Sequence, residues 1–309
     1  MTKENKIVKA VVGILRNAKG ETLIAERRQG QFMGGFWELP GGKIEPGENN
    51  EESLARELKE ELGIIISAPK LIHTMCHQYP EKTVYLWIYT IDHFDNEARG
   101  AEGQSITWCP TEKLNDFNLL PTMKAIIHKI CLPEFYWITP ENEPEEALLE
   151  QLQAHINSGS KLVQLRAKTI LDASFVEGFY QICQDANVKL ILNTLHKTFE
   201  ESCDGWHLTT QELLSLDDRP CGTDKLLGAS THNLTEIEHA ETLDVDYISI
   251  APVEPTKSHP GRVSLGWDKA KELVEKSNLP AYLLGGMSLQ NLQDAHSINA
   301  QGVAGISQV

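Results

Sequence analysis

The chain has 309 residues and a formal net charge of −16, with 41% apolar and 23% charged residues, an ordinary composition for a globular protein. No run of about 18 apolar residues occurs, which excludes a membrane-spanning helix. The charged opening MTKENKIVKA is not a secretory signal. The six cysteines are far apart and form no CxxC pair, which indicates free thiols in a cytoplasmic protein rather than a disulfide framework or a zinc site.

The charge is unevenly divided along the chain. Up to residue 130 there are 16 Lys and Arg against 18 Asp and Glu, and beyond it 12 against 26. Proteins bind nucleic-acid phosphates through Lys and Arg. The strongly acidic second half therefore disfavours stable binding to nucleic acid. We therefore predict two domains, residues 1–131 and 135–309, that bind neither nucleic acid nor a membrane.

The first predicted elements are two apolar-rich strands, KAVVGILRN and ETLIAERR, which the turn AKG would join as a hairpin. WELPGGK then breaks regular structure. A helix is predicted next, because Asn49 and Glu52 have the spacing of a capping box. The helix would end at Leu62, since Gly63 is a typical C-terminal residue.

The predicted helix has an acidic edge beside its apolar stripe. The stripe consists of three leucines: Leu54, Leu58 and Leu62. On a helical wheel Glu57 and Glu61 stand next to it, one turn apart, with Glu60 further round and Arg56 facing the other way. A solvated charged face is the commoner interpretation of an acidic helix. A pair of acids at the edge of a core and beside a glycine turn instead favours a Mg²⁺ site, because a cation must offset their repulsion.

The spacing of this segment resembles a complete Nudix box. The matching residues are Gly42, Glu48, Arg56-Glu57-Leu58, Glu60-Glu61 and Gly63-Ile64. The segments LPGGKIEPGE, TVYLWIYTI and EGQSITWCP also resemble, in the same order, the MutT type, the 8-oxo-dGTP diphosphatases. The resemblance covers residues 6–130. It implies an α/β/α sandwich that hydrolyses a nucleoside diphosphate linked to another group, with Mg²⁺ or Mn²⁺ as the cofactor.

The Nudix resemblance also implies roles for single residues. The metal ligands would be the Gly41 carbonyl, Glu57, Glu60, Glu61 and Glu102, with one of these four glutamates taking a proton from the attacking water. The nucleotide pocket would be lined by Arg27, Phe32, Glu38, Leu39, Pro40, Gly41 and Met123. Met123 stands where the MutT type carries an asparagine that reads the altered guanine, and a thioether cannot donate and accept hydrogen bonds as an amide does. Methionine is also a common core residue, so the selected base stays open.

The second half contains eight apolar runs separated mostly by helix-length amphipathic segments. The runs are FYWITP, KLVQLRAK, KLILNT, GWHLTT, LLGAST, YISIAPV, AYLLGGM and GVAGIS. This alternation predicts a (β/α)₈ TIM barrel beginning with the strand at residues 135–138. Polar residues and glycines follow several runs. They either reach water at the strand ends or form a phosphate site at the carboxyl face of the barrel.

The strand ends resemble those of thiamine-phosphate synthase and its relative TenI, in VQLRAK, GASTHN, APVEPTKS, LLGGM and GVAGIS. The implied ligand contacts are Gln164, Arg166, Lys168, Asn193, Ser230, Thr256, Lys257, Gly286 and Ser307. The acidic residues of the family are altered: Thr194 replaces a metal-binding aspartate, Ala167 replaces a glutamate, and Glu212 is the nearest counterpart of a second aspartate. Because a lost carboxylate removes charge that the ion needs, we expect a ligand-binding or scaffolding barrel.

The chain stops after the eighth predicted strand, without an eighth helix. We expect the first domain or a second subunit to cover that flank, and a homo-oligomer is left open.

The best-supported function is Mg²⁺-dependent hydrolysis of 8-oxo-dGTP to 8-oxo-dGMP and pyrophosphate, which clears a damaged nucleotide. One alternative is a pyrophosphatase for thiamine-pathway pyrophosphates. Another is a bifunctional enzyme that retains thiamine-phosphate synthase activity.

Overall fold

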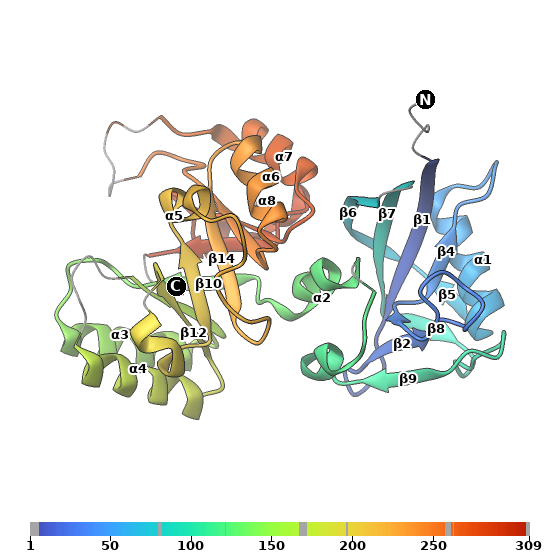
Figure 1. Ribbon diagram of the computed structural model, residues 1–309, viewed down its shortest axis with the longest axis horizontal. Coiled ribbons are helices and arrows are strands. Elements are labelled where there is room, and N and C mark those ends of the chain that lie inside the picture. Colours follow the sequence, from blue (N-terminus) through green and yellow to red (C-terminus); the bar gives the residue numbers. More distant parts are fainter. Residues whose placement is uncertain are drawn as a thin grey trace. The chain divides into compact units, whose positions relative to one another are not determined.

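The computed structural model describes residues 6–79, 82–120, 122–166, 172–195, 197–256, 261 and 263–306. The chain forms two compact units, Met1–Cys131 and Leu132–Val309, each considered below by itself (Figure 1). None of the helices within the described ranges is long and apolar enough to cross a membrane.

In the part of the first unit that the structure describes, nine strands form three sheets and are accompanied by two α-helices. Its elements are β1 (Lys6–Leu15), β2 (Thr22–Glu26), β3 (Trp37–Glu38), β4 (Gly41–Lys43), α1 (Asn50–Leu62), β5 (Ile65–Ser67), β6 (Lys70–Tyr79), β7 (Lys82–Ile91), β8 (His93–Asp95), β9 (Ile106–Cys109), the 3₁₀ helix η1 (Thr111–Asp116) and α2 (Met123–Cys131). The sheets have the strand orders β4-β1-β7-β6, β3-β2-β9 and β5-β8.

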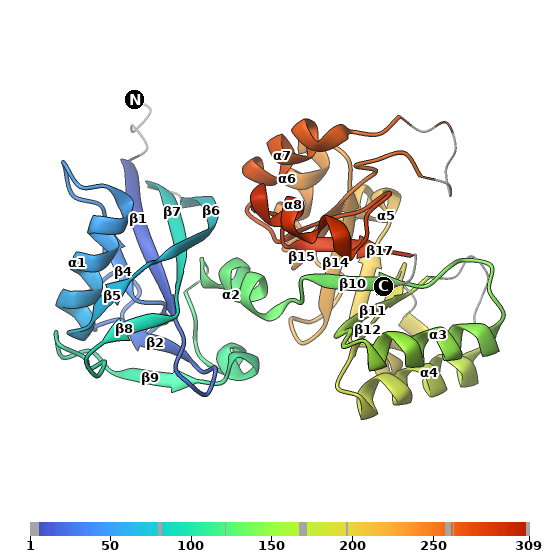
Figure 2. The same cartoon turned by 180° about the vertical axis from the view of Figure 1, so that it is seen from behind.

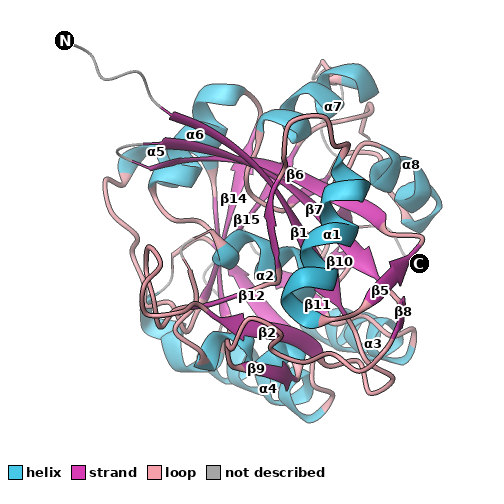
Figure 3. Cartoon of the chain, turned by 90° about the vertical axis from the view of Figure 1, so that its right-hand side faces the viewer, coloured by secondary structure: helices cyan, strands magenta, loops and turns pink. Residues whose placement is uncertain are grey.

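The largest sheet lies between two apolar layers, because alternate residues of a strand point to opposite faces. Val11 and Leu15 of β1 pack with the leucines of α1, whereas Val12 and Ile14 pack with α2. Figure 3 shows α1 in front of β1 and β7. The predicted α/β/α sandwich is confirmed.

One local prediction is wrong. The turn after β1 forms, with Gly20 at φ 78°. However, β1 and β2 are joined only by a bridge between Arg16 and Thr22, and each strand pairs within a different sheet. Each strand pairs more extensively with another strand: β7 lies along all ten residues of β1, and β9 pairs with four residues of β2.

The predicted bounds of α1 are confirmed. The Asn49 side chain accepts a hydrogen bond from the Glu52 amide, and the Glu52 carboxylate accepts one from the Asn49 amide. Gly63 ends the helix in a left-handed conformation. The three leucines of the stripe are fully buried. The helix is therefore fixed at both ends by its own sequence and on one face by the core.

The second unit is a barrel of eight parallel strands. Its elements are β10 (Phe135–Ile138), α3 (Glu145–Asn157), β11 (Leu162–Leu165), α4 (Ala173–Asp185), β12 (Lys189–Asn193), η2 (Lys197–Ser202), β13 (Gly205–Leu208), α5 (Thr210–Ser215), β14 (Leu226–Thr231), α6 (Leu234–Thr242), β15 (Tyr247–Ile250), α7 (Gly266–Lys276), β16 (Ala281–Leu283), η3 (Leu289–Asn291), α8 (Leu292–Ser297) and β17 (Gly302–Gly305).

The barrel closes in chain order from β10 to β17, so all eight predicted strands are confirmed. Helices α3 and α4 lie side by side on its outside (Figure 2). Its interior is packed with aromatic rings rather than open. Tyr136 meets Tyr282 edge to face with ring centroids 4.8 Å apart, and Tyr247 meets Tyr282 at 5.7 Å. The expected covering of the last flank concerns how the units or subunits associate, and it stays a prediction.

Candidate active site

The acidic face of α1 meets the glycine turn, as expected from its position in the sequence. The Gly41 amide donates a hydrogen bond of 3.1 Å to Oε2 of Glu61. The Glu57 carboxylate packs against Gly42, where a Cβ atom would lie 2.2 Å from the Glu57 carboxyl carbon. Gly41 adopts a φ of 146°, and a Cβ there would overlap the Val11 carbonyl. Gly42 therefore leaves room for the Glu57 carboxylate, and Gly41 allows the turn to pass close to β1.

Ionising these carboxylates is costly in the metal-free protein. Burial raises the pKa of Glu61 to about 7, the Gly41 amide opposes this, and the charges of Glu38, Glu57 and Glu102 raise the pKa further. Burial also raises the pKa of Glu57. A cation at this position would offset both the cost of ionising a half-buried carboxylate and the repulsion between neighbouring carboxylates.

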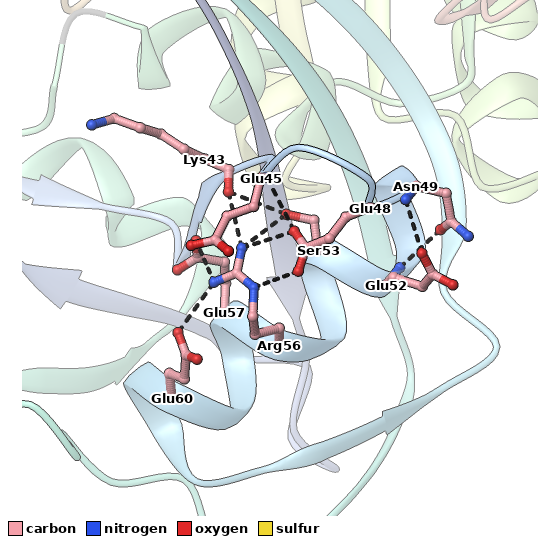
Figure 4. Close-up of polar contacts among 9 residues, drawn as sticks. All are labelled: Lys43, Glu45, Glu48, Asn49, Glu52, Ser53, Arg56, Glu57 and Glu60. Carbon is pink, nitrogen blue, oxygen red and sulfur yellow. Dashed lines mark hydrogen bonds and ion pairs between the residues drawn. The ribbon is translucent and has the colours of Figure 1, made fainter.

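Arg56 lies among the acids, contrary to the helical-wheel prediction that it faces the other way. Its Nε is 2.6 Å from Glu48 Oε1, and its Nη1 is 3.0 Å from Glu57 Oε1 and 3.1 Å from Glu60 Oε2 (Figure 4). This guanidinium lowers the pKa of Glu48 to about 2. The wheel gives only the direction of the Cα–Cβ bond, whereas a long arginine side chain reaches one turn along the helix and across to the preceding loop.

A ready-made ligand cluster is absent from the described parts of the chain, where no three His, Cys, Asp or Glu side chains are grouped to hold an ion. Glu57 and Glu60 are each paired with Arg56. The available donors are nevertheless carboxylate and carbonyl oxygens beside a carboxyl that is hard to ionise. This donor set fits a hard divalent cation.

Glu102 reaches the same end of α1 from the segment between β8 and β9. The Ala101 amide and the Gln104 side chain both donate to the Glu61 carbonyl, each over 2.9 Å. The carboxylate of Glu102 is paired with Arg28, with 2.8 Å between Oε2 and Nη2. Sequence reasoning missed Arg28, although its position directly after Arg27 was a signal that could have found it.

The predicted nucleotide-pocket residues occupy neighbouring positions. Arg27 Nη1 contacts both carboxylate oxygens of Glu38, at 2.5 and 2.6 Å, and its Nε donates to the Phe32 carbonyl over 2.9 Å. The Phe32 side chain is 60% exposed, and the Lys82 ammonium lies 4.5 Å from its ring centroid. Sequence reasoning also missed Lys82, because its contact with Phe32 joins two segments that are distant in the sequence.

Three further pocket residues are buried. Leu39 and Pro40 lie beneath the surface, and Met123 is only 3% exposed. The Met123 sulfur accepts a hydrogen bond from the Leu39 amide, with 3.4 Å between sulfur and nitrogen. Met123 therefore belongs to the apolar core between the sheet and α2.

The predicted barrel residues that can be described lie at the carboxyl ends of the strands. Gln164 donates to Asn193 Oδ1 over 2.8 Å, and Ser230 Oγ lies 3.1 Å from Nε2 of His207. Arg166 forms an ion pair with Glu141, a residue that the sequence did not single out. Thr256 and Gly286 follow β15 and β16. Lys168, Lys257 and Ser307 lie outside the described residues.

Glu212 has a structural role in the barrel. It occupies the third position of α5, where its carboxylate accepts hydrogen bonds from the Thr209 amide over 2.9 Å and the Thr209 hydroxyl over 2.8 Å. Its other oxygen accepts from the Leu195 amide over 3.1 Å. The carboxylate that could have replaced a metal ligand is thus occupied by a helix cap.

Comparison with protein families agrees with both halves of the structure. The family described as thiamine monophosphate synthase matches residues 135–309, which is more than half of the chain. The chain belongs to the thiamine monophosphate synthase family. A NUDIX domain matches residues 11–129. This member of the family is therefore also a Nudix hydrolase.

Individual relatives match only part of the chain. The 8-oxo-dGTP diphosphatase of Escherichia coli is 34% identical over 125 residues, which cover 40% of this chain and 97% of that protein. The thiamine-phosphate synthase of Methanobrevibacter smithii is 30% identical over 179 residues, covering 56% of this chain and 84% of that protein. A solved MutT structure from a study of Aliivibrio salmonicida and Vibrio cholerae is 28% identical, with a TM-score of 0.37, and covers 40% of this chain and 97% of its own.

Proposed function

We propose that the Nudix unit hydrolyses 8-oxo-dGTP to 8-oxo-dGMP and pyrophosphate with Mg²⁺, or Mn²⁺ in its place, and so removes a damaged nucleotide. The observation that carries this proposal is the contact of the Glu57 and Glu61 carboxylates with the Gly41–Gly42 turn. Two half-buried acids whose pKa values are raised are held there against the main chain of the turn. The 8-oxo-dGTP diphosphatase relatives support the choice of substrate.

In this proposal the residues of the site divide the work. Glu57, Glu61 and the Gly41 carbonyl hold the cation, and Glu60 supports it from the exposed side. When bound, the cation neutralises phosphate oxygens and lowers the pKa of a water molecule. Glu102 takes the proton of the attacking water, since its loop ends beside Glu61. Arg27, Glu38 and the buried Leu39 and Pro40 form the wall against which the nucleotide lies.

We further propose that the barrel binds a small phosphorylated ligand or serves as a scaffold, without synthase activity. Asn193 and Thr194 supply no carboxylate, and the carboxylate of Glu212 caps α5. Arg166 is already balanced by Glu141. The barrel therefore offers few carboxylates to bind the Mg²⁺ ion that accompanies a diphosphate.

A second candidate function is hydrolysis of a thiamine-pathway pyrophosphate. The position of Met123 favours this candidate. Its buried thioether already accepts a hydrogen bond from the Leu39 N–H and cannot form the paired hydrogen bonds by which an asparagine side chain would recognise an altered guanine. Sites that lack such hydrogen bonds discriminate poorly between bases. The attached barrel belongs to a family that suits such a substrate.

A turnover panel tests these proposals. The full chain with Mg²⁺ is supplied separately with 8-oxo-dGTP, dGTP, thiamine diphosphate and hydroxymethylpyrimidine diphosphate, and released pyrophosphate or phosphate is measured. A strong preference for 8-oxo-dGTP over dGTP supports the first proposal and eliminates the second. Faster turnover of a thiamine-pathway diphosphate reverses that conclusion. A matched E61Q variant identifies the turnover that belongs to the Nudix site.

A further inference from the structure

Two consecutive arginines at the end of β2 hold two of the acids that surround Glu61. Arg27 is paired with Glu38 through both carboxylate oxygens. Arg28 is paired with the Glu102 carboxylate at 2.8 Å, and its Nη1 also donates to the Glu102 carbonyl over 3.3 Å. The charges of Glu38 and Glu102 both act on Glu61 and raise its pKa. The two arginines therefore connect the nucleotide wall with the segment that carries Glu102.

Besides the Arg28 contact with its carbonyl, the main chain around Glu102 is held by three further hydrogen bonds. The Ala101 amide and the Gln104 side chain bond to the Glu61 carbonyl, and the Glu102 amide donates to Gln104 Oε1 over 3.0 Å. The Glu102 side chain, in contrast, is 40% exposed and projects from this anchored turn. A glutamate with that much exposure has several accessible rotamers, so an ion pair is needed to favour one of them.

We propose that Arg28 is a positioning residue that keeps the Glu102 carboxylate beside Glu61, ready to take the proton of the attacking water. The inference rests on the proposed hydrolase function and adds to it a residue outside the Nudix box. Arg28 acts through Glu102 and needs no contact with the nucleotide. Because the pair is half-exposed, its loss lowers turnover by a moderate factor, roughly five- to tenfold, rather than abolishing it.

The test measures kcat and KM for 8-oxo-dGTP and dGTP in the variants R28A and R28K and in the control R16A. Arg16 is an exposed arginine of the same unit at the end of β1. We expect R28A to lower kcat roughly five- to tenfold with KM changed less than about twofold. R28K restores at least half of the lost rate on a logarithmic scale, and R16A matches the wild type.

A double-mutant cycle separates action through Glu102 from a general structural effect. In the E102Q background the carboxylate is absent, so the further change R28A leaves kcat unaltered. A rise in KM at constant kcat would show that Arg28 binds substrate directly and would overturn the inference. A loss that is as large in the E102Q background as in the wild type would overturn it too.

A measurement without metal or substrate gives an independent readout. Amide hydrogen exchange of the metal-free full chain reports on the turn that contains Ala101 and Glu102. We expect the Glu102 amide to exchange at least about threefold faster in R28A, with the amides of α1 unchanged and R16A like the wild type. Unchanged exchange at Glu102 contradicts the inference. If the wild type hydrolyses none of the panel substrates, the proposed function fails, whereas normal wild-type turnover with a fully active R28A rejects Arg28 alone.

Discussion

The amide of Gly41 donates a hydrogen bond of 3.1 Å to the carboxylate of Glu61, and so joins the glycine turn to the last turn of α1. The contact brings a half-buried acid, whose pKa is raised to about 7, against a main-chain segment without side chains. Ionising such a carboxylate destabilises the metal-free fold, but the charged carboxylate can act as a ligand for a cation.

The first prediction concerns Glu61 itself. The change E61Q should lower turnover by about 10²- to 10⁴-fold, because the amide loses the charge on which the cation depends. The metal-free protein should melt at the same temperature or higher, since the variant also removes repulsion among the surrounding acids. Enzyme assays and thermal unfolding check both points. E51Q, at an exposed acid in the first turn of the same helix, is the control and should stay active; equal activity in the two variants contradicts the assignment.

The second prediction uses the close approach of Gly42 and Glu57. In G42A the new methyl group would overlap the Glu57 carboxylate, the far end of a flexible side chain, which can move away. We expect turnover to fall by at least about tenfold with little loss of stability, because only the carboxylate is displaced. The matched change G30A adds a methyl group into open space and should have no effect. A fully active G42A would mean that the position of Glu57 is unimportant.

The third prediction concerns pH and the interior of the barrel. His207 is buried, with Nδ1 3.3 Å from the Tyr247 hydroxyl and Nε2 3.1 Å from Ser230 Oγ. Burial, aided by the charge of Arg166, lowers its pKa to about 3. The unfolded chain, with an ordinary histidine pKa, takes up a proton below about pH 6.5 while the folded barrel does not. Stability from the neutral His207 is therefore complete above that pH and is lost as the pH falls towards 3.

The variant H207Q makes this pH dependence measurable. It removes the titrating group, so the difference in free energy of unfolding between wild type and variant should shrink by about 2 kcal/mol between pH 7 and pH 5. Urea unfolding of the full chain, followed at the transition that the variant shifts, provides the measurement. A difference of the same size at both pH values would show that His207 becomes charged inside the folded barrel.

The fourth prediction concerns the barrel reaction. The full chain should form no thiamine phosphate from hydroxymethylpyrimidine diphosphate and thiazole phosphate in the presence of Mg²⁺. The reason is that Glu212 caps α5, while Asn193 and Thr194 provide no carboxylate. Chromatographic detection of thiamine phosphate, with an active synthase as the positive control, is sufficient. Its formation at an appreciable rate would establish a bifunctional enzyme.

The sequence was informative wherever structure depends on neighbours along the chain. The bounds of α1 follow from its capping box and from Gly63, because those hydrogen bonds join residues a few positions apart. The eight barrel strands follow from the alternation of apolar runs with amphipathic segments, since every parallel strand needs a crossover before the next one. Both features were predicted correctly from local pattern alone.

Pairing between distant segments required the tertiary structure. The wheel placed Arg56 away from the acids, yet its long side chain reaches Glu48, Glu57 and Glu60. The hairpin prediction for β1 and β2 failed because each strand forms a more extensive pairing with a strand elsewhere in the chain. The sequence near β1 and β2 does not indicate which distant strand each of them pairs with.

The sequence by itself therefore determined that the chain carries a Nudix unit and an eight-stranded barrel, with the carboxylates of α1 on one face. Only the tertiary structure decided that Arg28 meets Glu102, that Glu141 meets Arg166, and that the Met123 sulfur is taken by the Leu39 amide. Hydrophobic period and helix caps act over a few residues. A side-chain pair between remote positions exists only after folding has brought its two segments together.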